Sequence, residues 1–187
     1  MKLSAPNIVT LSRVFLIPIF IIIFYLPVSW CYVGSALIFA LASFTDWLDG
    51  YLARRLAQTS AFGAFLDPVA DKLLIAVALV LIVGHRQIAL ITLPSAVIVG
   101  REIVISALRE WMAEAGKRAS VAVSIVGKVK TVVQMIAILF LLAYNPRQSG
   151  AEIIYIIGAL LLYVAAVLTI WSMCIYMKAA WLEMKGR

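Results

Sequence analysis

Residues 46–71 read DWLDGYLARRLAQTSAFGAFLDPVAD and hold all four aspartates of the chain, Asp46, Asp49, Asp67 and Asp71. The surrounding sequence is strongly apolar, and an ionised carboxylate inside a membrane segment is costly unless it is partnered. Four neighbouring carboxylates would also repel one another unless cations lay between them. Hard divalent cations prefer such oxygen ligands. The stretch therefore predicts a metal site within a membrane protein.

The composition of the whole chain supports this interpretation. Hydrophobic residues make up 65% of the 187 residues, and the mean hydropathy is +1.07, far above that of ordinary soluble domains. The formal net charge is +7. Because the basic residues are scattered through and between apolar segments, they indicate membrane orientation, lipid headgroups and anionic ligands, and no nucleic acid.

The apolar segments predict an all-α integral membrane protein with a single domain that covers residues 1–187. A bilayer core needs about 20 apolar residues per helix, and on that rule the sequence predicts six spans. A short segment before the first span is expected to lie at the membrane interface. The predicted spans cover residues 10–27, 32–54, 61–83, 88–112, 120–144 and 152–177.

The lysines and arginines predict the orientation of these spans. The turns expected at 28–31, 84–87 and 145–150 carry only Arg86 and Arg147. The positive-inside rule therefore places the opposite side, with both termini, in the cytoplasm. That side carries Lys2, Arg13, Arg54, Arg55, Lys117, Arg118, Lys178, Lys185 and Arg187.

The second and third spans form a hairpin that turns near residue 58, and this brings the aspartates to one depth. Asp49 and Asp67 each lie nine residues from that point, and the other two lie twelve and thirteen residues away. The four therefore sit roughly 14–20 Å of helix from the turn. Spacings of i,i+3 and i,i+4 put the two acids of each helix on one face.

Two other interpretations of the aspartates stay open at this point. They could be structural acids in salt bridges, although buried ion pairs rarely repay their desolvation. They could also line a proton or cation pathway, since intramembrane acids commonly do so in transporters. All four lie on one hairpin, however, and this favours a metal site that opens to the cytoplasm.

The quoted stretch also fits the pattern D-x2-D-G-x2-A-R-x8-G-x3-D-x3-D at every fixed position. It resembles the signature of the CDP-alcohol phosphatidyltransferases, and the six predicted spans agree with that family. Residues 6–13, 101–110 and 127–131 resemble the bacterial members that use glycerol 3-phosphate as acceptor. The resemblance implies transfer of a phosphatidyl group from CDP-diacylglycerol to glycerol 3-phosphate, with release of CMP. A cardiolipin synthase, or another enzyme of the family with a different acceptor, is the alternative.

The resemblance further implies a set of roles for individual residues. Two divalent cations, Mg²⁺ or Mn²⁺, would be held by Asp46, Asp49, Asp67 and Asp71. Asp71 would also be the catalytic base, with a ligand-only role as the alternative. The CDP moiety would be lined by Gly50, Ala53, Arg54 and Gly63. The family also implies a homodimer in the bacterial cytoplasmic (inner) membrane, surrounded by lipids, with its site open to the cytoplasm.

The acceptor carries a phosphate, and basic residues on the fourth and fifth spans are placed to bind it. Arg101 lies fifteen residues before the expected turn near residue 116, and Lys128 and Lys130 lie twelve and fourteen residues after it. The three cations therefore reach about the depth of the aspartates. Buried cations need an anion, and arginine can bind phosphate in a fork.

Other residues extend this predicted phosphate site or compete for it. Arg109 lies about two turns nearer the cytoplasm on a similar face. Thr10 and Arg13, at the start of the first span, are further candidates for glycerol 3-phosphate. The alternative is that the cations pair with Glu102, Glu110 or the aspartates and serve the structure only.

Overall fold

The structure is a computed structural model that describes residues 5–56, 61–86, 89–114 and 125–185. Within the helices, several side chains lie outside this description, among them those of residues 5–10, 46–65, 67 and 128. The helices in the described part are α1 (Ala5–Tyr25), α2 (Cys31–Leu56), α3 (Ala61–Arg86), α4 (Ala89–Glu114), α5 (Ile125–Ala143) and α6 (Glu152–Lys185).

The prediction of an all-α chain with six main helices is confirmed for the described residues. Residues 5–9, which belong to the segment predicted to lie at the membrane interface, form the first turns of α1, and their position at the interface stays a prediction. Pro6 permits this helical start because the first N–H groups of a helix have no intrahelical acceptor to lose. Residues 1–4 and the predicted beginning of the fifth span, 120–124, lie outside the described residues.

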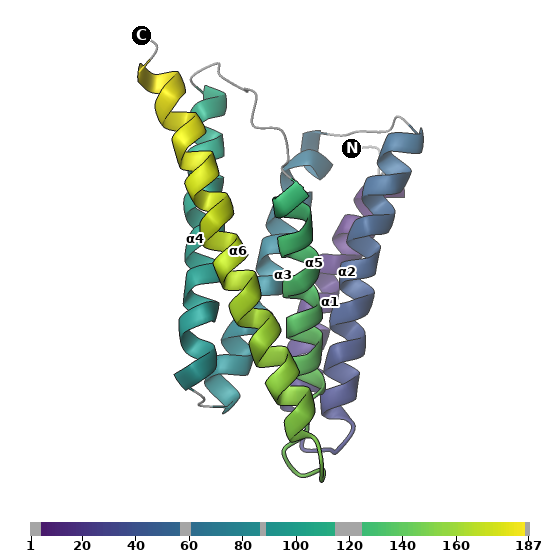
Figure 1. Cartoon of the computed structure of the whole chain (residues 1–187). Helices are drawn as coiled ribbons and strands as arrows, with labels where there is room; N and C mark the ends of the chain where they lie inside the picture. Colours follow the sequence, from purple (N-terminus) through teal and green to yellow (C-terminus); the bar gives the residue numbers. More distant parts are fainter. Residues whose placement is uncertain (1–4, 57–60, 87–88, 115–124, 186–187) are drawn as a thin grey trace.

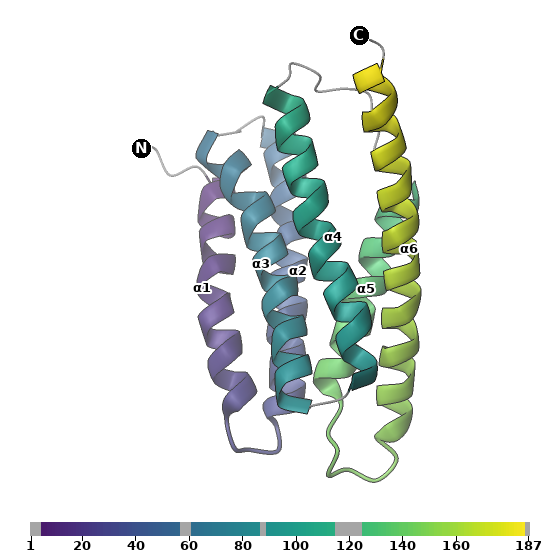
Figure 2. The same cartoon turned by 90° about the vertical axis from the view of Figure 1, so that its left-hand side faces the viewer.

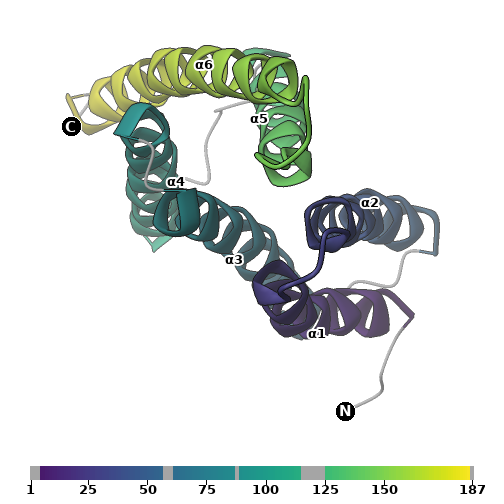
Figure 3. The same cartoon turned by 90° about the horizontal axis from the view of Figure 1, so that it is seen from below.

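The helices run alternately up and down. The starts of α1, α3 and α5 lie at the same end of the bundle as the ends of α2, α4 and α6 (Figures 1 and 2). Viewed along the bundle, α1 and α2 form one pair, α5 and α6 form another, and α3 and α4 lie between them (Figure 3). Helix α6 also packs on α4, and α5 packs on both α2 and α3. This arrangement surrounds one region with α3, α4, α5 and α6.

The apolar core lies in the half of the bundle opposite the end that carries both chain ends. Buried apolar side chains from all six helices form it. The largest of these core side chains include Phe20, Phe39, Leu79, Ile138 and Leu162.

The outer surface of the bundle is apolar on every helix. Soluble proteins rarely expose continuous apolar surface of this kind, so lipid is the medium that fits it. Three described segments have the length and composition of a membrane span: Pro68–His85, Leu90–Met112 and Glu152–Lys178. The apolar segments of α1, α2 and α5 are shorter than these three. Large exposed side chains, one from each helix in order, are Phe15, Leu37, Val80, Leu93, Val132 and Trp171.

The connection between α5 and α6 is a tight turn, as the sequence predicts for residues 145–150. The side-chain oxygen of Asn145 accepts a hydrogen bond from the backbone N–H of Arg147, at 3.0 Å. Gly150 has a φ of 79°, in the left-handed region that glycine adopts without steric cost. Glu152 then begins α6, where a negative charge interacts favourably with the helix dipole.

Close packing of α5 on α6 depends on Gly158. A β-carbon at this position would lie 2.9 Å from Cγ of Leu141, which is closer than non-bonded carbons approach. We expect Gly158→Ala to destabilise the protein by about 1–3 kcal/mol, because the two helices must move apart. Gly84→Ala is the control, since a β-carbon there meets no described atom within 4 Å. Thermal unfolding in detergent should show a lower Tm for Gly158→Ala only, and equal Tm values would contradict the packing argument.

Candidate active site

A cavity of about 190 Å³ lies between α3, α4, α5 and α6 and is lined mainly by polar and charged side chains. It is where the structure brings together the predicted base and the predicted phosphate-binding cations. The acids and the cations come from three different helices that the chain visits in succession. The lining residues are Asp71, Ile75, Arg101, Glu102, Arg109, Gly127, Lys130, Thr131, Gln134 and Tyr176.

Two of the cations share one carboxylate inside this cavity. Nη1 of Arg101 lies 2.9 Å from Oε1 of Glu102, and Nζ of Lys130 lies 2.5 Å from the same oxygen. The two basic residues are only 8% and 4% exposed. Pairing with Glu102, one alternative drawn from the sequence, is therefore present. Asp71 supplies a second carboxylate and Arg109 a third cation, so the described lining of the cavity keeps an excess of one positive charge.

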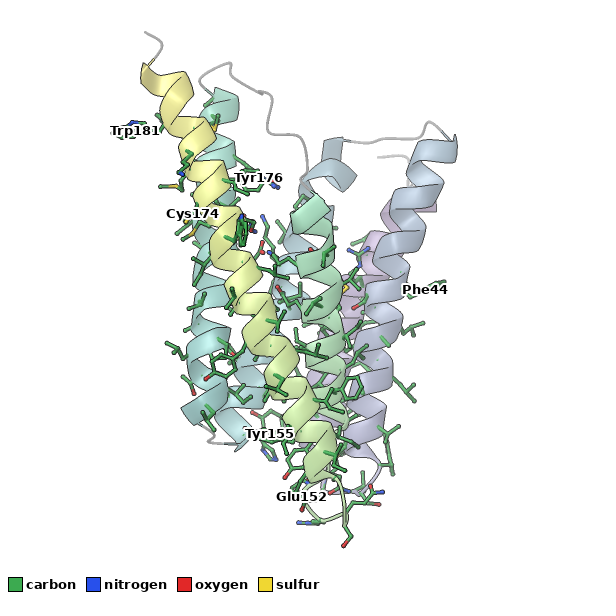
Figure 4. All side chains as sticks on the ribbon, in the orientation of Figure 1. Phe44, Glu152, Tyr155, Cys174, Tyr176 and Trp181 are labelled. Atoms are coloured by element: carbon green, nitrogen blue, oxygen red, sulfur yellow. The ribbon has the colours of Figure 1, made fainter. Side chains whose placement is uncertain are left out.

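Helix α6 positions both arginines of the cavity. Nη2 of Arg101 donates to the hydroxyl of Ser172, and Nη2 of Arg109 donates to the hydroxyl of Tyr176, each at 3.0 Å. The ring of Tyr176 lies 5.8 Å from the Arg101 guanidinium and 5.0 Å from that of Arg109, within the range of a cation–π interaction. Tyr176 projects from α6 toward the inside of the bundle, whereas Cys174 and Trp181 project outward (Figure 4).

The contribution of α6 was missed in the sequence, although a signal was present. Thr169, Ser172 and Tyr176 are spaced by three and four residues and so lie on one helix face. All three are buried in an otherwise apolar helix. Their identity alone does not reveal which cation they meet, because this depends on how α6 packs against α4.

Asp71 lies on α3 and lines the cavity together with Arg101, Arg109 and Lys130. The sequence predicts Arg101 and Lys130 at about the depth of the aspartates, and the structure brings these two cations and Asp71 to one cavity. Arg109, predicted about two turns nearer the cytoplasm, lines the same cavity. Asp46 and Asp49 belong to α2, and Asp67 to α3, and these two helices contact each other. The side chains of these three aspartates lie outside the described residues, so their meeting point stays a prediction.

Arg13 is completely buried, at 0% exposure, on α1. It is not among the residues that line the cavity, and α1 packs against α2 and α3. The structure therefore places it apart from the Arg101–Lys130 cluster. The remaining predicted site residues belong to α1, α2, α3 or α5, and their side chains lie outside the described residues: Thr10, Gly50, Ala53, Arg54, Gly63 and Lys128.

A larger and mainly apolar groove of about 500 Å³ runs between α3 and α4. It shares Ile75 and Glu102 with the polar cavity, so the two spaces are neighbours. Nζ of Lys72 donates a hydrogen bond to the hydroxyl of Ser106 across this groove. Exposed apolar side chains such as Leu73 and Ile103 line it. The groove thus borders the polar cavity and is itself lined by exposed apolar side chains.

Together, the apolar helical bundle, the signature D-x2-D-G-x2-A-R-x8-G-x3-D-x3-D and the cationic cavity define a membrane enzyme of phosphate-ester chemistry. The chain belongs to the CDP-alcohol phosphatidyltransferase family, whose profile it matches over residues 3–171. It is 54% identical to the CDP-diacylglycerol–glycerol-3-phosphate 3-phosphatidyltransferases of Shigella flexneri, Salmonella typhimurium and Escherichia coli K12. Each of these matches spans 180 residues and covers 96% of both chains.

Proposed function

We propose that the protein transfers the phosphatidyl group of CDP-diacylglycerol to the 1-hydroxyl of sn-glycerol 3-phosphate. The acceptor oxygen forms a bond to the phosphorus that carries the diacylglycerol, the bond from that phosphorus to the CMP oxygen breaks, and the hydroxyl proton leaves to a base. The products are phosphatidylglycerophosphate and CMP. The observation that carries the proposal is the cavity in which Asp71 faces Arg101, Arg109 and Lys130.

The acidic signature fits a site for two divalent cations, Mg²⁺ or Mn²⁺. Carboxylate oxygens are the ligands these ions prefer, and Asp46, Asp49, Asp67 and Asp71 lie on two helices that contact each other. When bound, the cations would neutralise the diphosphate and stabilise the charge on the leaving oxygen. The four aspartates would hold them, and the family to which the chain belongs is consistent with this chemistry.

Asp71 is the proposed base. It borders the cavity that the acceptor would occupy, and its carboxylate would take the proton from the 1-hydroxyl as the new bond forms. Asp71 also belongs to the acidic signature, and this is consistent with a role as a metal ligand. The two roles are compatible, since a carboxylate has two oxygens.

The acceptor phosphate is proposed to bind at Arg101, Arg109 and Lys130. Among the described lining residues these three cations face two carboxylates, those of Asp71 and Glu102, and this excess of positive charge favours an anion. Nε of Arg101 is buried without a hydrogen-bond partner among the described residues, which leaves a donor for a ligand. Lys128 on α5 and Thr10 on α1 are further candidates for this substrate, whereas Arg13 is no longer one because it does not line the cavity.

The donor lipid is proposed to reach the site through the groove between α3 and α4. Its apolar lining fits an acyl chain, and the groove borders the polar cavity at Glu102. Gly50, Ala53, Arg54 and Gly63 would line the CDP moiety next to the aspartates. The small residues among them leave room for the nucleotide, and Arg54 would interact with its phosphates.

We further propose that all six helices span the bacterial inner membrane as one domain over residues 1–187. Both termini and the site would face the cytoplasm. The end of the bundle that carries the start of α1 and the end of α6 also carries the aspartate signature (Figure 1). Residue charges on that side satisfy the positive-inside rule. The functional unit would be a homodimer, as in the family.

The acceptor site predicts a selective kinetic defect. Arg101→Gln or Lys130→Met should weaken the binding of glycerol 3-phosphate and leave the KM for CDP-diacylglycerol nearly unchanged. Loss of one charge-assisted contact costs about 1.5–3 kcal/mol, which is roughly tenfold to a hundredfold in kcat/KM for the acceptor. Steady-state kinetics with each substrate varied in turn measures this. Arg147→Gln is the control, because Arg147 is an exposed cation outside the helices.

A double variant separates phosphate binding from structural pairing. Lys130→Met leaves Glu102 with one cation fewer, and Glu102→Gln removes the charge that Lys130 neutralises. If Lys130 serves only to pair with Glu102, the double variant should recover wild-type kinetics. We expect its KM for glycerol 3-phosphate to stay high, and full recovery would contradict the proposed phosphate site.

The acceptor itself is tested by comparing four alcohols with one donor. With CDP-diacylglycerol supplied, CMP release should be fastest with glycerol 3-phosphate and slow with serine, inositol and phosphatidylglycerol. Faster release with phosphatidylglycerol would identify a cardiolipin synthase instead. Faster release with serine or inositol would show that the cationic cavity does not select a phosphate.

A further inference from the structure

Gln134 is a buried polar residue that the proposed mechanism leaves without a role. It lies on α5, one helical turn beyond Lys130 and on the same face, and it lines the same cavity. Its side chain is buried, at 1% exposure. Its Oε1 atom has no hydrogen-bond partner among the residues that the structure describes.

Burial of an unpaired amide is unfavourable, so the position calls for an explanation. An amide oxygen removed from water without a compensating hydrogen bond destabilises the folded state, and an apolar side chain of the same size would not carry this penalty. Rotation of the amide would exchange oxygen and nitrogen but would leave one of them in the same unpaired place. A ligand in the cavity would supply the missing partner in either orientation, provided that it can both donate and accept.

A hydroxyl group has this property. The other polar groups of the described lining are three cations suited to a phosphate, the carboxylates of Asp71 and Glu102, and two hydroxyls. Both hydroxyls already have a partner: that of Thr131 donates to the backbone oxygen of Gly127, and that of Tyr176 accepts from Arg109. The proposed acceptor presents a phosphate, a reacting 1-hydroxyl and a second hydroxyl at C2. The phosphate is assigned to the cations and the 1-hydroxyl to Asp71, so the 2-hydroxyl is the group without a partner.

We propose that the side-chain amide of Gln134 binds the 2-hydroxyl of glycerol 3-phosphate and makes the enzyme selective for a hydroxylated three-carbon acceptor. This inference rests on the proposed function and assigns a specificity role within the same cavity. A site that hydrogen-bonds a substrate hydroxyl rejects the analogue that lacks it, because its own polar group is then left unpaired.

The test compares two acceptors in two proteins. The acceptors are glycerol 3-phosphate and 3-hydroxypropyl phosphate, which keeps the phosphate and the reacting hydroxyl but lacks the hydroxyl at C2. The proteins are the wild type and Gln134→Met, in which an apolar side chain of similar size replaces the amide. We expect the wild type to prefer glycerol 3-phosphate by roughly tenfold to a hundredfold in kcat/KM. Gln134→Met should lose most of that preference while retaining activity on the analogue.

Ser95→Ala is the matched control. The Ser95 hydroxyl is also buried without a described partner, but it does not line the cavity, so its loss should leave acceptor preference unchanged. A wild type that uses both acceptors equally would overturn the inference, and so would a Gln134→Met variant that keeps the full preference. If Gln134→Met does not fold, Gln134→Leu, another apolar replacement without the amide, takes its place in the same comparison. A wild type that transfers to neither acceptor would instead overturn the proposed function itself.

Discussion

Replacing Asp46, Asp49 or Asp67 by Asn is expected to reduce turnover to below about one thousandth of the wild-type rate. An amide keeps the shape of the side chain but removes the charge that binds a divalent cation, and with it the stabilisation of charge in the transition state. Measurement of CMP release as a function of Mg²⁺ or Mn²⁺ concentration should show that the remaining activity requires far more metal. Glu152→Gln is the control, because this acid lies at the far end of the bundle (Figure 4).

The same variants should not be less stable than the wild type when metal is absent. Four carboxylates held close together repel one another, so removal of one charge relieves the metal-free protein. Thermal unfolding with and without divalent cation tests this: metal should raise the Tm of the wild type more than that of the variants. If any of these Asn variants keeps a near wild-type rate with unchanged metal dependence, the replaced aspartate is not a ligand.

Asp71→Asn is expected to lower kcat by roughly a hundredfold to ten-thousandfold, the usual contribution of a general base. Binding of CDP-diacylglycerol should change little, because a base acts in the chemical step. Asp71 lines the cavity with Arg101 and Lys130. Loss of its negative charge should therefore not weaken the binding of the acceptor phosphate either. The measurements are single-turnover rates and a direct binding assay for the donor lipid.

The contrary result for Asp71 is a parallel loss of donor binding and activity. That outcome would show that Asp71 acts only as a metal ligand. Lys72→Gln provides a neighbouring control: Lys72 follows Asp71 in the chain, but it binds Ser106 and does not line the polar cavity. Its replacement should leave the chemical step intact.

The helices could be predicted from the sequence because apolar segments of membrane length leave few alternatives. Their ends were less predictable. Helix α6 continues to Lys185, beyond the predicted end at residue 177, because hydrophobicity marks where a membrane ends and not where backbone hydrogen bonding ends. Helix α1 begins at Ala5 for the same reason.

The meeting of Asp71 with Arg101 and Lys130 was also predictable. Helix rise and the position of each hairpin turn determine the depth of a residue, and the three residues do line one cavity. Depth does not reveal lateral neighbours, however. The shared carboxylate of Glu102 and the contacts of Ser172 and Tyr176 with the arginines depend on which helix faces which. That information lies in long-range packing and not in local spacing.

The central claim is that the acids and cations of this bundle serve a phosphatidyl transfer. The most direct test is CMP release from CDP-diacylglycerol by the purified protein in lipid vesicles, with divalent cation and glycerol 3-phosphate each added or withheld. We predict that CMP appears only when both are present, in equal amount to phosphatidylglycerophosphate. Absence of CMP release under these conditions, with uptake of protons or divalent cations into the vesicles instead, would contradict the account and identify a transporter.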